Sequence, residues 1–155
     1  MKNPVEIYNS LDFKNFNIDM LAFVNENNIK STTGYLITTS LKTKYTYIFK
    51  ENGDKWDEIY KWICTVGKKT TPTIKGYFYI TGRKPWFGTN QYRAKYATRF
   101  IGRYYYHSIL YDSNGKYVID SRLGMELSHG CIRLLTNNAK WIYDNIPNLT
   151  PVIIA

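Results

Sequence analysis

The feature that most constrains this fold is a series of short strand-forming runs that begins at Gly34 and continues almost to the last residue. Tyr35–Thr39 and Tyr45–Phe49 are rich in Tyr, Thr and Ile, which fit the pleated surface of a sheet. The polar residues 41–44 between them suit a hairpin, and Asn52–Gly53 turns the chain again. Similar runs recur at residues 77–80, 100–111, 117–120 and 152–154. We therefore predict a mostly β domain that is mostly antiparallel.

Two segments have helical patterns instead. Asp19 is an acid near the start of an apolar stretch that ends at Asn27–Asn28, which predicts a short helix at about residues 17–27. We interpret residues 1–30 as a helical leader or linker, and residues 31–155 as the main domain. Thr136 suits the N-cap of a second helix that stops before Pro147. Its predicted apolar face consists of Ala139, Ile142, Tyr143 and Ile146.

Two further segments, residues 56–66 and residues 82–98, have patterns that predict a strand and a loop. Residues 56–66 alternate as one long strand, which places Cys64 inside that strand as a small apolar residue. Residues 82–98 lack a sustained period and contain Pro85, Gly88 and Asn90. A loop of that length in a compact domain is usually functional, so we predict a lid or substrate wall that carries Trp86 and Phe87.

The positive charge is concentrated in the middle of the chain. The net charge is +9, and the segment from Gly67 to Arg103 contains basic residues but no Asp or Glu. Such a segment creates a positive field that attracts anionic polymers or carboxylates. Aromatic side chains interleave with these charges, which leaves open a polymer- or nucleic-acid-binding module with a structural cysteine. A solvated basic surface without a partner is the third alternative.

Cysteine usage and hydropathy leave the compartment open. Cys64 and Cys131 are the only cysteines, which is too few for a disulfide framework, although a single bridge stays open. No apolar run is long enough to form a transmembrane segment, and no signal-like apolar segment follows Met1. Either the protein stays inside the cell or this numbering lacks a targeting segment.

The richest concentration of reactive groups is the heptad Ser128–Leu134. If it is extended, His129, Cys131 and Arg133 project to one face, because side chains alternate along a strand. A thiol beside an imidazole and a cation can become a nucleophilic thiolate. The chain has only two histidines, so an imidazole base for Cys131 is either His107 or His129. Gly130 would let a substrate approach the backbone closely.

Two other interpretations of Cys131 compete with nucleophilic catalysis. Free cysteines are often buried as small apolar residues, so Cys131 could be structural. The two histidines and Cys131 could also bind zinc, but a structural zinc site needs a fourth ligand and no paired-cysteine motif supplies it. Zinc binding is therefore the less favoured of these interpretations.

The heptad Ser128-His129-Gly130-Cys131-Ile132-Arg133-Leu134 resembles the signature of the L,D-transpeptidases, the YkuD-type catalytic domains that remodel bacterial peptidoglycan. Thr71-Pro72-Thr73 followed by Gly76 resembles the family's Thr-Pro-Thr-Pro-x-Gly strand entry, and Leu123-Gly124 fits as well. Ile74 replaces the second proline of that pattern, and Ser108 follows His107 where many members have glycine. The resemblance covers about Gly34 to Ala155 and excludes the first thirty residues.

The resemblance implies a β-sandwich-like YkuD-type fold with a helix after the cysteine segment. It assigns Cys131 as nucleophile, His107 as general base, and the backbone carbonyl of Ser108 as the group that orients His107. Backbone amides at Gly130 and Cys131 would form the oxyanion hole. The pocket would contain Ser128, His129 and Arg133, and the substrate groove would contain Trp86, Phe87 and Tyr92.

The resemblance also implies a reaction and partners. The thiolate would attack the third residue of a peptidoglycan stem peptide, release the terminal D-alanine, and pass the acyl group to an amine of another stem or to water. The implied reaction requires no metal and no organic cofactor. Carbapenem-type β-lactams are expected to inhibit covalently, and no nucleic-acid partner is expected. Because such a substrate lies outside the membrane, we expect an extracytoplasmic location, with a signal or anchor missing from this numbering.

Overall fold

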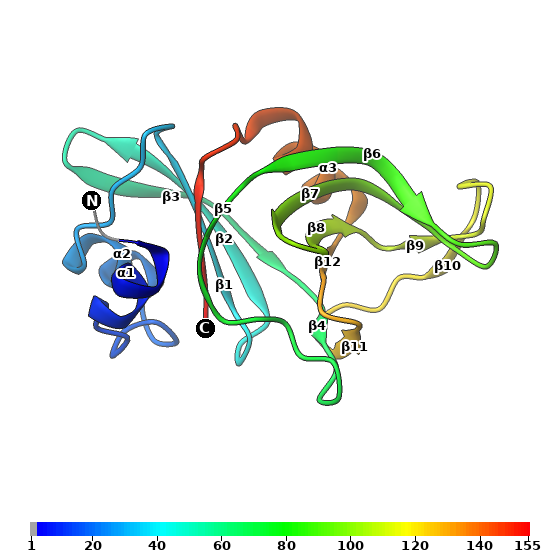
Figure 1. The fold of residues 1–155 in the computed structure, drawn as a ribbon, viewed down its shortest axis with the longest axis horizontal. Helices are drawn as coiled ribbons and strands as arrows, with labels where there is room; N and C mark the ends of the chain where they lie inside the picture. Colours follow the sequence, from blue (N-terminus) through cyan, green and yellow to red (C-terminus); the bar gives the residue numbers. More distant parts are fainter. Residues whose placement is uncertain (1–2) are drawn as a thin grey trace.

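The computed structural model describes residues 3–155 as a mostly β protein with three helices (Figure 1). The helices are α1 (Pro4–Ser10), α2 (Met20–Glu26) and α3 (Thr136–Asn145). The strands are β1 (Tyr35–Ser40), β2 (Tyr45–Asn52), β3 (Lys55–Ile63), β4 (Val66–Gly67), β5 (Gly76–Tyr79), β6 (Gly82–Gly88), β7 (Arg93–Ile101), β8 (Tyr104–Ser108), β9 (Leu110–Tyr111), β10 (Val118–Asp120), β11 (Glu126–Ser128), β12 (Ile132–Leu134) and β13 (Pro151–Ile154). Within residues 3–155, no helix is long and apolar enough to cross a bilayer.

The first sheet has the strand order β3-β2-β1-β13-β5. The predicted hairpin joins β1 to β2, with Leu36 opposite Phe49 and Ile37 opposite Ile48. The C-terminal strand β13 lies in the interior of this sheet, parallel to β1 and antiparallel to β5. Four buried residues in a row explain why β13 reads as a continuous apolar run rather than as an alternating one.

The two N-terminal helices cover one face of this sheet, at the left of Figure 1. Asp19 caps α2 by accepting a hydrogen bond from the N–H of Ala22, and this helix lies within the predicted range. Helix α1 was not predicted, although Asn3 caps it and Pro4 opens it. Buried side chains of the leader form one apolar cluster with the sheet, among them Phe16, Met20, Phe23, Val24, Leu36, Phe49 and Trp56.

The second sheet is curled and has the order β10-β9-β7-β8-β12, with β6 paired to β7. The prediction of a loop over residues 82–98 was wrong, because β6 and β7 form an antiparallel hairpin in which Gly82 pairs with Arg99 and Gly88 with Arg93. Among residues 3–155, β6 pairs only with β7 and is therefore an edge strand. An edge strand tolerates Pro85, which has no backbone N–H to donate to a neighbouring strand. No residue of this edge strand is buried, and Lys84, Pro85 and Trp86 are exposed in succession, so the strand lacks the alternating pattern that would have revealed it.

Two strands that were predicted as continuous are interrupted. Residues 100–111 divide into the end of β7, the turn at Gly102–Arg103, strand β8 and the short strand β9. Gly102 has a φ of +49°, which glycine adopts without steric cost and which reverses the chain. Strand β3 ends at Ile63, so Cys64 lies just outside it, fully buried in the core.

Helix α3 packs against β7, β8 and β12 and closes the main core. Ala139 and Ile142 on this helix are fully buried, as predicted, together with Ile146 just after it. Thr136 is the first helical residue rather than the N-cap, which is Leu135. The Thr136 hydroxyl instead shares a 2.5 Å hydrogen bond with the Tyr111 hydroxyl, which holds the start of α3 against β9.

Candidate active site

A parallel strand pair brings the cysteine heptad next to His107. Strand β12 pairs with β8, so that Ile132 lies opposite Tyr106 and Arg133 opposite His107. Ile132 and Tyr106 are fully buried in the core. Because side chains alternate, Arg133 and His107 project to the other face of the sheet. The prediction that the heptad is extended is correct from Ile132 to Leu134, whereas Cys131 stands immediately before the strand.

This face borders a cavity of about 350 Å³, which we call the Cys131 cavity. The structure brings most of the predicted site residues to it, but Trp86 does not line it. Trp86 is 49% exposed, and its ring lies against the guanidinium of Arg93, with 3.7 Å between the guanidinium carbon and the ring centroid. The lining residues are Phe87, Gln91, Tyr92, His107, Leu110, Asp120, Leu127, Ser128, His129, Cys131 and Arg133.

Cys131 is partly buried, and its sulfur contacts the backbone of the β7–β8 turn. The N–H of Tyr105 donates to Sγ at 3.4 Å, and the thiol donates to the carbonyl oxygen of Arg103 at 3.5 Å. Burial raises the pKa of the Cys131 thiol, while the Tyr105 N–H and the charge of Arg103 oppose that rise. Cys64 is fully buried, which raises its pKa to about 12 and makes it unreactive.

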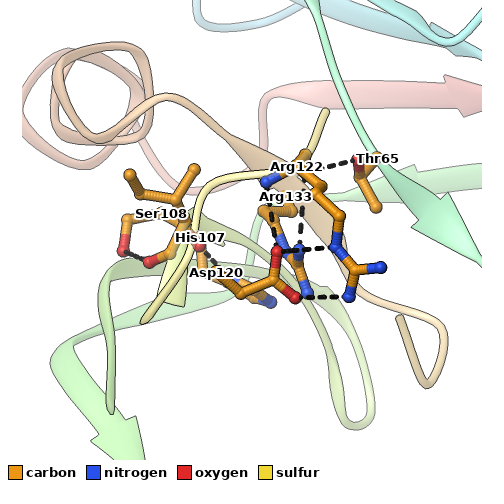
Figure 2. Close-up of polar contacts among 7 residues, drawn as sticks. Thr65, His107, Ser108, Asp120, Arg122 and Arg133 are labelled. Carbon is orange, nitrogen blue, oxygen red and sulfur yellow. Dashed lines mark hydrogen bonds and ion pairs between the residues drawn. The ribbon is translucent and has the colours of Figure 1, made fainter. Parts of the chain in front are cut away.

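His107 is buried and held in one orientation. Its Nδ1 lies 2.6 Å from the carbonyl oxygen of Ser108, as Figure 2 shows. A carbonyl can only accept, so Nδ1 carries the proton and Nε2 keeps a free lone pair. Burial lowers the pKa of His107 to about 4, assisted by the charge of Arg133 and opposed by the Ser108 hydrogen bond. The imidazole is therefore a neutral base at neutral pH. The Phe87 ring packs edge-on against it, with 5.3 Å between the two ring centroids.

The turn before Cys131 depends on glycine. Gly130 has a φ of +125°, and a Cβ there would lie 2.5 Å from Cε1 of Tyr104. The N–H of Gly130 donates to Oγ of Ser128 at 3.1 Å, and that hydroxyl donates to the carbonyl oxygen of Cys131 at 2.5 Å. The family resemblance assigned this N–H to an oxyanion hole, but in the structure it donates to the Ser128 side chain.

The Thr-Pro-Thr segment supports the same turn. The hydroxyl of Thr71 and the N–H of Lys68 both donate to the carbonyl oxygen of Ser128, at 3.0 Å and 2.9 Å. The hydroxyl of Thr73 accepts from the N–H of Gly67 at 2.9 Å. Thus the segment that was singled out only as a motif fixes the backbone three residues before the cysteine.

Arg133 is paired with a carboxylate that the sequence reasoning missed. Its Nη1 lies 3.2 Å from Oδ1 of Asp120, and its side chain is 5% exposed (Figure 2). Arg122 binds the same carboxylate through Nε at 3.0 Å and Nη2 at 2.9 Å. These hydrogen bonds hold the pKa of Asp120 well below its usual range. A buried arginine needs an acidic partner to balance its charge, and this requirement could have pointed to Asp120 in the sequence.

The imidazoles and the thiol do not form a metal-binding group. His107, His129 and Cys131 line the same cavity, yet residues 3–155 contain no group of three or more His, Cys, Asp or Glu side chains able to hold an ion. The arrangement is instead that of a partly buried thiol and a fixed neutral imidazole on one cavity wall, which suits nucleophilic acyl transfer.

Comparison with known proteins identifies the family. Residues 34–154 match the model of the L,D-transpeptidase catalytic domain, YkuD. YciB of Bacillus subtilis strain 168, named as an L,D-transpeptidase, is 34% identical over 129 residues, which cover 77% of this chain and 64% of YciB. The chain thus spans somewhat less than two thirds of that relative.

Solved structures share the fold. A fused Zn-dependent amidase/peptidase/peptidoglycan-binding domain-containing protein from Clostridium acetobutylicum is 40% identical, with a TM-score of 0.74, over 88% of this chain and 58% of that protein. The L,D-transpeptidase LdtMt1, solved in complex with imipenem, has 22% identity and a TM-score of 0.63 over 79% of this chain and 59% of its own. From the family match and the shared fold, we conclude that this chain belongs to the L,D-transpeptidase (YkuD) catalytic-domain family.

Proposed function

We propose that the protein is a peptidoglycan L,D-transpeptidase whose nucleophile is Cys131 and whose general base is His107. The observation that carries this proposal is their joint position on the wall of the Cys131 cavity, with the imidazole fixed by the Ser108 carbonyl. Membership of the family supports the reaction class. A purely structural role for Cys131 is disfavoured because its side chain borders the cavity rather than the core.

The resting site holds a neutral thiol and a neutral imidazole, because burial raises the pKa of Cys131 and lowers that of His107. We therefore assign the proton transfer to the moment of attack. Nε2 of His107 accepts the thiol proton while sulfur bonds to the carbonyl carbon of the third stem residue. The amide bond to D-alanine then breaks, and the imidazolium returns the proton to the departing amine.

The product of this step is a thioester between Cys131 and the shortened stem. An amine of a second stem attacks the thioester carbonyl, which forms the cross-link and releases the thiol. Attack by water would give carboxypeptidase activity instead. Neither route requires an organic cofactor.

The tetrahedral intermediate needs hydrogen-bond donors for its negative oxygen. We assign the N–H of Cys131 as the first donor. The N–H of Gly130 becomes the second donor if it leaves its present acceptor, Oγ of Ser128, and bonds to the oxyanion instead. This change requires only a small movement within one turn. Arg133 is held by Asp120 and contributes positive charge behind the site rather than a free guanidinium for substrate.

The substrate groove follows from the cavity lining. Phe87 and Tyr92 line the same cavity as Cys131, and we assign them to the acyl-donor stem. The partners are peptidoglycan stem peptides, which places the proposed reaction outside the cytoplasm. The imipenem complex of LdtMt1 supports carbapenems as ligands of this site, and we propose that they bind to Cys131 covalently.

D-alanine release from a purified disaccharide-tetrapeptide tests the proposal. The Cys131→Ala variant should release no D-alanine above background. Cys64→Ala is the matched control, because it removes the other thiol and should retain activity once its folding is verified by circular dichroism. Undiminished release by the Cys131→Ala variant would disprove the assignment of the nucleophile.

A further inference from the structure

A second hollow lies on the β6–β7 hairpin and shares no lining residue with the Cys131 cavity. It has a volume of about 250 Å³, and we call it the Arg99 hollow. Its lining consists of Gly82, Arg83, Lys84, Arg99 and Tyr105. Lys84 and Arg99 are cationic and no lining residue is acidic, so this small space carries positive charge. The Arg83 side chain projects to the opposite face of the hairpin, because Arg83 pairs with Thr98 and Gly82 pairs with Arg99.

Neutral groups hold the two guanidiniums in place. Nη1 of Arg83 donates to Oδ1 of Asn148 at 3.1 Å, and its Nη2 donates to the carbonyl oxygen of Ile146. Nε of Arg99 donates to the hydroxyl of Thr81 at 3.0 Å. These bonds orient the guanidiniums without neutralising them. Both Nη groups of Arg83 are thus already bonded, whereas Arg99 and Lys84 bring unbalanced positive charge to the hollow.

No carboxylate compensates the cluster within residues 3–155. The ion pairs found there involve Lys14, Lys44, Arg122, Arg133 and Lys140, and none involves a cation of the hollow. Lys84 instead places its Nζ 5.6 Å from the centroid of the Tyr105 ring. The half-buried charge of Arg99 lies in the same hollow as Lys84, which is unfavourable unless an anion balances it.

We propose that the Arg99 hollow binds a phosphate group. Guanidiniums match the oxygens of phosphate in pairs, and the two cations Lys84 and Arg99 suit a doubly charged tetrahedral anion better than a single carboxylate. The Tyr105 side chain adds a hydroxyl and an aromatic wall. The phosphate can come from free orthophosphate or from a linear phosphate polymer that runs along β6.

The hollow stands next to the proposed nucleophile without being part of its cavity. Tyr105 lines the hollow through its side chain, and its N–H donates to Sγ of Cys131. A phosphate polymer bound there would hold the protein on an anionic surface with the Cys131 cavity beside it. The binding inference does not depend on the proposed reaction, because it can be tested without turnover.

Titration calorimetry and backbone NMR at constant ionic strength test the site, with sodium orthophosphate, sodium polyphosphate and sodium acetate as probes. Orthophosphate should shift the amide signals of Gly82, Lys84 and Tyr105 saturably. The double variant Lys84→Gln/Arg99→Gln should bind at least tenfold more weakly. Arg83 is left intact, since its bonds to Ile146 and Asn148 also support the fold.

The matched control is Lys30→Gln/Lys55→Gln, which removes the same charge from two exposed residues outside the hollow and should bind orthophosphate as the wild type does. If polyphosphate binds more tightly per phosphate group than orthophosphate does, the natural ligand is a phosphate polymer. If the two bind equally tightly per phosphate group, the ligand is free phosphate. Both results support the site. The proposal is overturned if orthophosphate gives no saturable shift, if the control loses as much affinity, or if acetate binds equally tightly. It is also overturned if a single-stranded oligonucleotide binds more tightly than polyphosphate of equal charge, because base stacking would then dominate.

Discussion

Replacing Asp120 by Asn should destabilise the protein because it leaves Arg133 as an uncompensated buried charge. Removing one partner of a buried ion pair typically costs about 3–5 kcal/mol. Here the cost is reduced, because the Asp120 side chain is 18% exposed and Nη1 of Arg133 keeps the carbonyl oxygen of Arg122 at 3.4 Å. We therefore expect a loss of about 2–3 kcal/mol in the free energy of unfolding. For a chain of this size, that lowers Tm by about 4–12 °C.

The loss should also depend on pH. The folded state holds the pKa of Asp120 below its ordinary value of 3.8, so the carboxylate stabilises the fold above that pH and loses its contribution as the pH falls toward the folded value. The difference between wild type and the Asp120→Asn variant should thus be largest near neutral pH and shrink in acid.

Urea unfolding monitored by circular dichroism measures both effects. Asp144→Asn is the matched control, since Asp144 forms an exposed ion pair with Lys140 on α3. Exposed pairs contribute little, so we expect this control to lose less than about 0.5 kcal/mol. If Asp120→Asn is no less stable than the control, the argument from an unpaired buried arginine is refuted.

Three further predictions concern the site. Gly130→Ala should lower kcat/KM for D-alanine release roughly tenfold to a hundredfold, because the added Cβ meets Tyr104 in a strained backbone; full activity would contradict this. The acid limb of kcat/KM should have its midpoint near the His107 pKa of about 4, since only the unprotonated imidazole accepts the thiol proton; a midpoint near 6.5 would show that burial does not shift His107. Phe87→Ala should impair turnover more than Trp86→Ala, because only Phe87 lines the cavity; equal steady-state losses would be the opposing result.

Much of the fold is readable from the sequence because its signals are local. The β1–β2 hairpin has strand formers on both sides of a polar turn, and α2 has its capping Asp19. The β6–β7 hairpin was misread as a loop because β6 is an edge strand with no buried residue and with a proline inside it. The pairing of β6 with β7 depends on tertiary structure, which the periodicity of the sequence does not predict.

The site residues also fall into those that the sequence predicted and those that depend on tertiary structure. Cys131, His107 and Arg133 were predicted from residue types and from the family resemblance, and the register of β8 against β12 brings them to one face. Asp120 was missed because no local spacing links it to Arg133. Trp86 was assigned to the groove as one of the aromatic residues of the predicted lid, yet it does not line the cavity that Phe87 lines, because neighbours in a strand face opposite sides.

The most direct test of the central claim is intact-mass analysis after exposure to imipenem. The account predicts that the wild type and the Cys64→Ala variant each gain the mass of one ligand, and that the Cys131→Ala variant gains none. Peptide mapping should then place the adduct on Cys131. Equal labelling of the Cys131→Ala variant, or an adduct at another residue, would contradict the assignment of Cys131 as the nucleophile.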